Sequence, residues 1–267
     1  MLDMHTHSTL SHDGENDMRE MVEHAFKSGL KVIASTEHID LNVYYSSKYK
    51  NNILIPRGHK EIRKLKEEYA DKIKLIYGVE FAQSVHDKAF AKEIIDEYQF
   101  DYVLGSVHAV REISDFYYLD YNELDNHDLM TKFFNETLEM VEWGEIDAVA
   151  HLTYPLRYIV GRCKIDFKLS TFDNKIREIF KVMVAKNIAL ELNTCGMRLD
   201  NYNRPDPDFG YFELYKEMGG DMVTIGSDAH NKQFIGCDIP AALKKLKEIG
   251  FDRVTYFEKR KPFYLDI

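Results

Sequence analysis

Imidazole and carboxylate side chains recur in this chain directly after short apolar runs. His5 and His7 follow the first run, close to the N-terminus, and Asp228 and His230 follow the last run, close to the other end. Side chains two residues apart in an extended segment point to the same side. Neutral imidazoles and carboxylates are ligands that divalent transition ions accept. The pattern therefore indicates a metal centre to which both ends of the chain contribute.

The same arrangement recurs in the middle of the chain. Glu80 ends the run Leu-Ile-Tyr-Gly-Val-Glu, His108 ends Val-Leu-Gly-Ser-Val-His, and His151 ends Asp-Ala-Val-Ala-His. Of the 11 histidines, those at or just past the end of a predicted strand are His5, His7, His12, His38, His108, His151 and His230. So many polar groups would be costly to bury together without compensating ions. We therefore predict that the chain binds metal.

Strand-like and helical patterns alternate along the chain and position these groups. Strands are predicted at residues 2–5, 32–36, 73–80, 102–107, 148–151, 188–193 and 222–227, with a candidate eighth at 253–257. Helices, with apolar residues at i, i+3 and i+4, are predicted at 18–28, 59–69, 88–97, 128–143, 171–185, 209–218 and 241–249. Asp128 and Ser170 are candidate N-caps, and helix ends are followed by Gly29, Gly144, Gly219 and Gly250.

The alternation of strand and helix predicts an α/β fold with a parallel sheet and right-handed crossovers. Seven or eight such units in 267 residues fit a single domain, 1–267, built as a closed or nearly closed barrel. An open doubly wound sheet also fits, but no G-x-G-x-x-G follows the first strand. The long segments 39–58, 109–125, 152–169 and 194–208 all follow strands, which is typical of a barrel enzyme with one active face.

Composition excludes several classes of protein. Hydrophobic residues make up 45% of the chain, and no apolar stretch approaches the roughly 20 residues that span a bilayer. The N-terminus lacks the basic and apolar regions of a signal peptide, so we expect a cytoplasmic protein. The three cysteines are widely spaced and form no C-x-x-C pair, which favours free thiols. The formal net charge of -10 disfavours a broad nucleic-acid surface.

Taken together, these motifs resemble the polymerase and histidinol phosphatase (PHP) superfamily. The segment His5-Thr6-His7-Ser8, followed by His12-Asp13-Gly14, resembles its opening H-x-H motif, and Thr36-Glu37-His38 resembles its second motif. Many members have Asp where this chain has Glu37. The remaining positions are filled by Glu80, Ser106-Val107-His108, His151 and Gly226-Ser227-Asp228-Ala229-His230. The resemblance implies a distorted (β/α)7 barrel whose metal site lies at the C-terminal rim of the strands.

The resemblance also implies two to three divalent ions, which are Zn, Fe or Mn in different members. By position, one ion would bind His5, His7, Glu80 and Asp228, a second Glu80, His108 and His151, and a third His12, His38 and His230. Glu80 would bridge two ions, which requires a carboxylate because an imidazole cannot present two oxygens. Glu37 is either a ligand or an outer partner that orients an imidazole. We favour the outer position for Glu37 and also for Asp13.

Among members of the superfamily, a lone chain of this length resembles the monofunctional L-histidinol-phosphate phosphatases of histidine biosynthesis. Ions that share a carboxylate can lie about 3.5–4 Å apart, and a water that bridges them loses a proton near neutral pH. We therefore expect in-line attack of that hydroxide on the phosphate monoester, with Glu80 as the bridge. Asp228 or His230 would protonate the leaving alkoxide.

Further residues are candidates for contacts to this small-molecule substrate. Arginine forks fit phosphate oxygens, and the candidates are Arg198 past residue 193 and Arg162 and Arg157 in the segment after His151. The loop aromatics Tyr117, Tyr118, Tyr154 and Tyr158 are candidates for the wall of an imidazole pocket.

Two other classes of function are alternatives to a phosphomonoesterase. One is a nuclease or nucleotide phosphodiesterase on the same scaffold, and the acidic chain without a Lys/Arg stripe disfavours polymeric DNA for it. The other is a non-catalytic or polymerase-associated metal-binding module, which the intact ligand set disfavours. We expect no membrane partner, and the sequence leaves the oligomeric state open.

Overall fold

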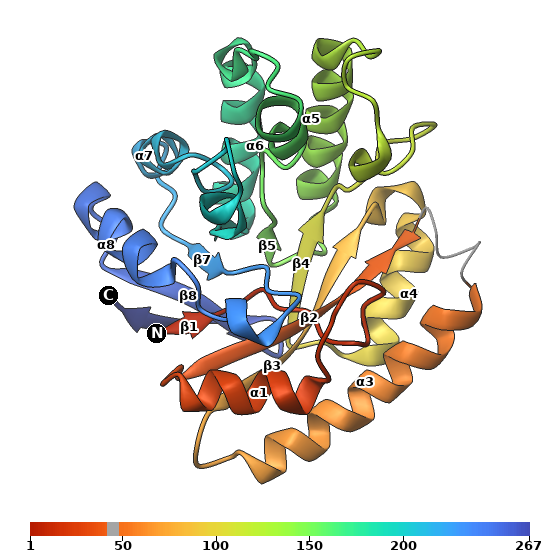
Figure 1. The fold of residues 1–267 in the computed structure, drawn as a ribbon, viewed down its shortest axis with the longest axis vertical. Helices are drawn as coiled ribbons and strands as arrows, with labels where there is room; N and C mark the ends of the chain where they lie inside the picture. The colour runs from red at the N-terminus through yellow and green to blue at the C-terminus, as the bar shows by residue number, and fades with distance from the viewer. Residues whose placement is uncertain (42–47) are drawn as a thin grey trace.

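The structure is a computed structural model that describes residues 1–41 and 48–267, with the side chains of 1–41 and 55–267. Its main sheet has seven strands. The strands lie side by side in chain order and are β1 (Leu2–Asp3), β2 (Val32–Asp40), β3 (Lys74–Ala82), β4 (Tyr102–Ser106), β5 (Ala148–Val149), β6 (Ala189–Asn193) and β7 (Val223–Gly226). All neighbouring pairs are parallel. The carboxyl ends of the strands therefore share one rim (Figure 1).

The segment that begins with β7 returns to the segment that begins with β1. The backbone N–H of Met4 donates to the carbonyl of Ile225 at 2.8 Å, and that of Asp228 donates to the carbonyl of His5 at 2.9 Å. A parallel bridge joins Thr6 to Ala229. The sheet is thus a nearly closed barrel, which confirms the predicted (β/α)7 fold and brings the segments after β1 and β7 together at the rim.

Helices cover the outside of the sheet (Figure 1). They are α1 (Met18–Lys27), α3 (Lys48–Glu68), α4 (Lys88–Tyr98), α5 (Asn126–Trp143), α6 (Asp173–Lys186), α7 (Phe209–Glu217) and α8 (Ile239–Ile249). With helices outside and side chains filling the interior, strands such as β3 are buried on both faces, as expected of a parallel sheet. None of the helices in 1–41 and 48–267 is both long and apolar enough to cross a membrane.

Helix α3 begins earlier than the sequence predicts. The helix was expected at 59–69 and a loop at 39–58, a segment rich in Tyr, Asn, Arg and Gly. In the structure β2 extends to Asp40 and α3 is helical from residue 48, with Pro56 inside it. Burial of Ile62 and Leu65 in the core outweighs the local cost. The rest of the predicted loop, 42–47, lies outside the described residues.

Several predicted boundaries are wrong for local reasons. Asp125, not Asp128, caps α5 by accepting from two backbone N–H groups. Ser170 lies inside a 3-10 turn, and α6 begins after Phe172 without a side-chain cap. The candidate eighth strand is β8 (Arg253–Glu258), which pairs antiparallel with β9 (Lys261–Asp266) in a separate sheet because the barrel already closes between β7 and β1.

Candidate metal centre

The carboxylate of Glu80 lies at the centre of a group of histidines over the carboxyl ends of the strands. The sheet register places His38 of β2 directly beside Glu80 of β3. Glu80 Oε1 lies 2.8 Å from His151 Nε2 and 3.0 Å from His108 Nε2. Oxygen Oε2 lies 3.2 Å from His5 Nε2, 3.4 Å from His7 Nε2 and 3.0 Å from His38 Nδ1. The two oxygens thus face two different sets of imidazoles.

Asp228 and His230 approach the same centre from the segment after β7. Asp228 Oδ1 lies 3.6 Å from the Nε2 atoms of both His5 and His7, and 3.7 Å from His230 Nδ1. The His230 ring stacks on the His7 ring with centroids 4.2 Å apart. Side chains that the sequence predicted from both ends of the chain therefore meet here.

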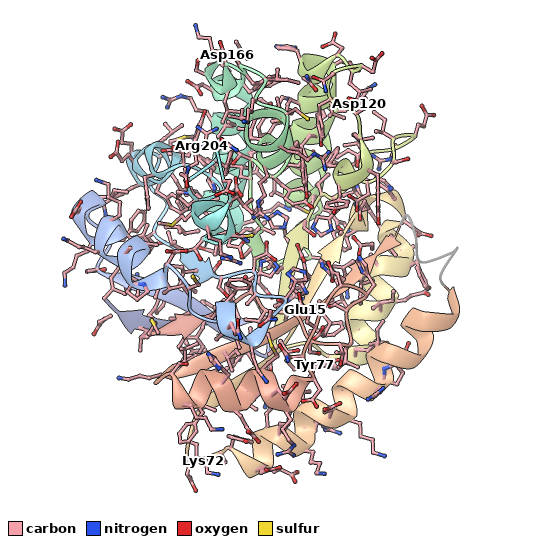
Figure 2. All side chains as sticks on the ribbon, in the orientation of Figure 1. Glu15, Lys72, Tyr77, Asp120, Asp166 and Arg204 are labelled. Carbon is pink, nitrogen blue, oxygen red and sulfur yellow. The ribbon has the colours of Figure 1, made fainter. Side chains whose placement is uncertain are left out.

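Five sets of three side chains bring potential ligand atoms within 4.8 Å of one another among the described residues. The sets are His5, His7 and Glu80; His5, His151 and Asp228; Glu80, His108 and His151; His7, His38 and His230; and His38, Asp40 and His108. Shared members make the sets one continuous cluster, which has room for more than one ion. Figure 2 shows side-chain nitrogen and oxygen atoms gathered in this middle region, between the strands and the loops above them.

The cluster fits divalent ions because its inner atoms have no hydrogen-bond partner. The buried atoms without one include His5 Nε2, His7 Nε2, His38 Nδ1, Glu80 Oε2 and His230 Nε2. Buried polar atoms are almost always paired, and each unpaired one costs about 1–3 kcal/mol. Lone pairs that converge from nitrogen and oxygen donors are what a zinc-like ion would satisfy.

Outer acceptors hold three of the imidazoles with Nε2 turned inward. His5 Nδ1 lies 2.6 Å from Glu191 Oε1, and His108 Nδ1 lies 2.9 Å from Asp40 Oδ1. Because a carboxylate only accepts, each Nδ1 carries the proton and each Nε2 keeps its lone pair for an ion. Glu191 is fully buried in β6, and its contact with His5 offsets part of the cost of burying its charge.

Glu37 orients the third imidazole, that of His7, through a serine. Ser11 Oγ donates to Glu37 Oε2 at 2.7 Å and lies 3.2 Å from His7 Nδ1, from which it accepts. Glu37 also accepts from the N–H and hydroxyl of Ser8 and from Ser35 Oγ. These contacts are those expected of an outer partner, and that role for Glu37 stays a prediction.

The carboxylates of the cluster favour positive charge on the groups around them. Burial alone would raise the pKa of Glu80, but the imidazoles of His108, His5 and His38 hold it well below its usual range. Burial alone would lower the pKa of His108, but Glu80 and Asp40 raise it to about 10. Burial and the neighbouring imidazoles of His38 and His230 hold the pKa of His7 well below its ordinary value. Carboxylates that raise the pKa of a neighbouring histidine favour positive charge at that place, and a metal cation would supply such a charge.

His12 and Asp13 lie at the edge of the cluster. The His12 side chain is 62% exposed, its Nε2 lies 3.8 Å from Asp13 Oδ2, and it belongs to none of the five sets. Asp13 approaches His230 Nε2 at 3.1 Å and His38 Nε2 at 3.6 Å. The set around His38 and His230 is completed by His7 rather than by His12, so His12 as a ligand stays a prediction.

Two members of the cluster sit on strained backbone. His151 has φ of 49° and Asp228 has φ of 55°, in the left-handed region that residues other than glycine seldom adopt. Strained backbone of this kind concentrates at functional sites, where the surrounding structure enforces it. At His151 the turn also explains why β5 stops at Val149 instead of reaching residue 151 as predicted.

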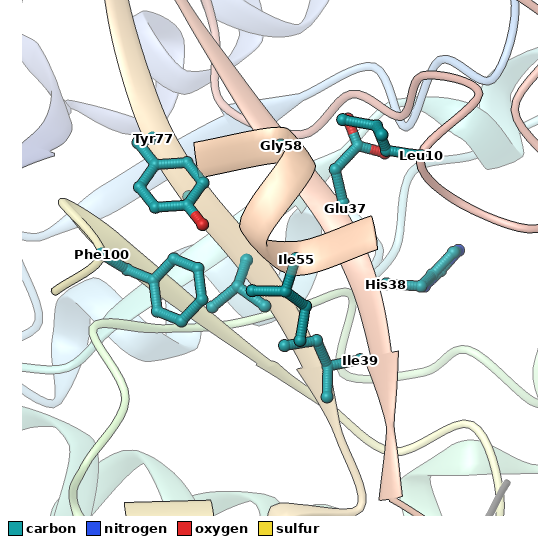
Figure 3. Close-up of a pocket in the computed structure, with 10 residues that line it drawn as sticks. Leu10, Glu37, His38, Ile39, Ile55, Gly58, Tyr77 and Phe100 are labelled. Atoms are coloured by element: carbon teal, nitrogen blue, oxygen red, sulfur yellow. The ribbon is translucent and has the colours of Figure 1, made fainter. Parts of the chain in front are cut away.

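A cavity of about 450 Å³ opens over the cluster, which is a size that suits a small-molecule ligand. Its lining includes the metal-binding candidates His12, His38, Glu80, His108, His151, Asp228 and His230, together with Asp115, Tyr117, Tyr118, Tyr154, Arg157, Tyr158 and Cys195. All four predicted aromatic residues therefore face it. Figure 3 shows a separate cavity of only about 20 Å³ among Ile39, Ile55 and Phe100, which has room for about one water.

The three predicted arginines differ in their relation to the cavity. Arg157 lines it and is buried, with Nη1 donating to Asp228 Oδ2 at 3.1 Å. Arg162 is exposed and donates to the carbonyls of Tyr117 and Leu119 at 2.7 and 3.0 Å. Arg198 donates to the carbonyl of Ser227 at 2.7 Å, and its Nη1 is buried without a partner. The structure thus brings Arg157 to the cluster, while Arg162 and Arg198 bind backbone beside it.

The outer carboxylates were not among the predicted site residues. Asp3 accepts from the N–H groups of Ser227 and Gly236 and so joins β1 to the segment after β7. Asp40 and Glu191 orient His108 and His5, as described above. The available signal was an acidic residue within a run otherwise apolar and buried, as in Ala-Leu-Glu-Leu-Asn. A charged residue inside a parallel strand is rarely buried without a partner.

Replacement of Glu191 by Gln is expected to weaken metal binding about 10- to 100-fold, the usual effect of losing an outer partner of a metal-binding histidine. Competition with a chromogenic chelator measures it. The matched control is Glu136→Gln, because Glu136 is also buried and lies 2.7 Å from His86, away from the cluster. Equal metal affinity in both variants would show that Glu191 does not support the site.

Comparisons with known proteins agree with this geometry. The PHP domain family model matches residues 3–195. Probable histidinol-phosphatases of Thermotoga maritima and Clostridium acetobutylicum are 32% and 31% identical over 261 residues, which cover 97% of this chain and 97% and 98% of theirs. The crystal structure of histidinol phosphate phosphatase from Lactococcus lactis, complexed with zinc, L-histidinol and phosphate, superposes with a TM-score of 0.81 at 25% identity and covers 98% of both chains. The chain belongs to the PHP domain family.

Proposed function

We propose that this protein is a metal-dependent phosphomonoesterase that hydrolyses L-histidinol phosphate to L-histidinol and phosphate. The observation that carries the proposal is the full-length match to the Lactococcus lactis enzyme, whose structure contains zinc, L-histidinol and phosphate. A cavity that joins a histidine–carboxylate cluster, a buried arginine and an aromatic wall supports the same activity. We also propose, from the sequence, a cytoplasmic protein with one domain.

The residues proposed to hold the ions follow the observed sets. His5, His7, Glu80 and Asp228 would hold one ion, and Glu80, His108 and His151 a second. His38 and His230 would hold a third with His7 or His12. When bound, such ions lower the pKa of water toward neutrality and neutralise phosphoryl oxygens, so they supply the nucleophile and much of the charge stabilisation.

Residues of the chain itself bind and orient the substrate. Arg157 is proposed to contact a phosphoryl oxygen, because it is the predicted arginine that lines the cavity. Tyr117 and Tyr118 at the exposed mouth, with Tyr154 and Tyr158 deeper, are proposed to flank the imidazole. Asp228 and His230 both line the cavity and are the two candidates to protonate the leaving alkoxide.

Steady-state kinetics of the metal-loaded enzyme test the proposal. L-histidinol phosphate would be compared with a nucleotide monoester and a nucleotide diester at equal concentrations. We expect kcat/KM to be highest for L-histidinol phosphate, by about 100-fold or more, since a site that pairs the polar groups of one substrate rejects analogues by such factors. A preference for the diester would instead indicate a phosphodiesterase.

Replacement of Arg157 by Lys is expected to lower kcat/KM for L-histidinol phosphate about 10- to 150-fold. The physical reason is that a point-like ammonium cannot reproduce the planar fork, and hydrogen bonds to charged groups contribute about 1.5–3 kcal/mol. The matched control is Arg260→Lys, because Arg260 also pairs with a buried carboxylate, that of Asp147, and does not line the cavity. If both variants lose activity equally, Arg157 is not the phosphate contact.

A further inference from the structure

A fully buried carboxylate, Asp206, pairs with Nε of Arg157, whereas Asp228 of the metal cluster pairs with Nη1. The Asp206 side chain has no exposed surface, and its Oδ2 accepts a hydrogen bond from Arg157 Nε. The residue follows the segment matched by the family model, which ends at residue 195. Nothing in the sequence pattern assigns it a role, because it stands in a polar loop between Pro205 and Pro207.

Each nitrogen of the Arg157 guanidinium has a partner. Besides Nε, Nη2 donates to Asn193 Oδ1 at 2.9 Å and Nη1 donates to Asp228 Oδ2 at 3.1 Å. A guanidinium has five N–H donors, so these contacts leave one N–H on each terminal nitrogen. Because Arg157 lines the cavity, the two remaining donors are the ones available to an oxyanion there.

Asp206 is itself held from several directions. Its Oδ1 accepts from Tyr202 Oη at 2.5 Å and from Thr153 Oγ1 at 3.1 Å. Its backbone N–H and carbonyl both pair with Asn193 at 3.0 Å. Asn193 in turn bonds Arg157, so the carboxylate and the amide fix two edges of the guanidinium plane from a single rigid unit.

We propose that Asp206 is a positioning residue that sets the orientation of Arg157 for binding a phosphoryl group. The inference rests on the proposed function only in taking phosphate as the group bound. Without the carboxylate, Arg157 would keep one acidic partner, Asp228, and the guanidinium would turn toward it. The two remaining donors would then no longer be held in place beside the cavity, although Asp206 never contacts the substrate.

The first test is the affinity of metal-loaded enzyme for inorganic phosphate, measured by calorimetry. We expect Asp206→Asn to weaken phosphate binding about 10- to 100-fold, by analogy with the loss of an outer partner of a metal ligand. The matched control is Asp147→Asn at the opposite end of the barrel. Asp147 is also buried and accepts from an arginine Nε, that of Arg260, so its loss disturbs a similar pair without touching the cavity. Equal weakening in both variants would overturn the proposal.

A double-mutant cycle separates positioning from a general structural role. If Asp206 acts through Arg157, Asp206→Asn added to Arg157→Lys should weaken phosphate binding by no more than about 2-fold further, because the two residues act as one unit. A further loss as large as in the wild-type background would overturn the proposal.

Tyr202→Phe provides a milder variant should Asp206→Asn fail to fold. It removes one hydrogen bond to Asp206 and keeps the charge pair, so we expect a loss of about 2- to 10-fold in phosphate affinity that disappears in the Arg157→Lys background. Phosphate binding unaffected by Tyr202→Phe in a folded enzyme would count against the proposal. Since the ligand is inorganic phosphate, these results do not depend on whether L-histidinol phosphate is the substrate.

Discussion

Complete removal of metal by a chelator is expected to abolish phosphatase activity, with a loss of more than about 1,000-fold. The cluster around Glu80 is made of groups that bind cations, and without ions its carboxylates would repel the phosphate dianion instead of neutralising it. The inner atoms of these groups are buried and lack hydrogen-bond partners, so a cation has no substitute within the described residues of the cluster. Activity on L-histidinol phosphate and metal content measured on the same sample provide the test.

Addition of Zn²⁺ or Mn²⁺ to the metal-free protein is expected to restore turnover. Chelator saturated with zinc beforehand serves as the control, because it has the same chemistry toward the protein but cannot extract an ion. Thermal unfolding adds a second measurement, since ions that bind only the folded state raise the midpoint. Full activity in a sample shown to contain no metal would contradict the metal centre.

The positions of the inner residues could be predicted because a parallel barrel has a simple rule. Every strand ends at the same rim, so a histidine or carboxylate directly after an apolar run is placed there without knowledge of its neighbours. His5, Glu80, His108 and Asp228 were found in this way, although they are far apart in the chain. The order of the strands and the closure of the barrel follow from the same alternation of elements.

The outer residues could not be predicted because their roles depend on which side chain lies opposite. Glu191 of β6 lies against His5, which follows β1. Asp206 reaches Arg157 from a loop, and hydrophobic periodicity does not predict the path of a loop. The three arginines show the same limit. Their sequence contexts are alike, but only the fold determines that Arg157 turns inward while Arg162 binds loop carbonyls.

Local signals also failed where tertiary packing decided the outcome. The segment up to residue 58 was predicted to be a loop, yet α3 is helical from residue 48 because its later turns pack on the sheet. The segment 253–257 has the pattern of a strand and is one, but closure of the barrel left it to pair with β9. In both cases the element type was readable from the sequence and its partner or extent was not.

Replacement of Glu80 by Gln is expected to lower activity by about 1,000-fold or more and to reduce the number of bound ions. Both oxygens of the carboxylate face imidazoles, with Oε1 near His108 and His151 and Oε2 near His5, His7 and His38. An amide of the same shape has one oxygen and one N–H₂ group, and the latter cannot bind a cation. One of the two sets would therefore lose its ligand, and the shared negative charge would be lost from both.

Glu80→Asp separates the charge from the reach of the side chain. It keeps a carboxylate but withdraws it by one methylene, so it should retain more metal than Glu80→Gln while still losing activity, because the spacing of a two-ion site is set by the bridge. Metal content by elemental analysis and kcat are measured for both variants, and Glu136→Gln controls for loss of a buried carboxylate elsewhere. If Glu80→Gln bound as many ions as the wild type and turned over at a similar rate, Glu80 would be a structural residue, and the ions would have to be held as separate sites without a common ligand.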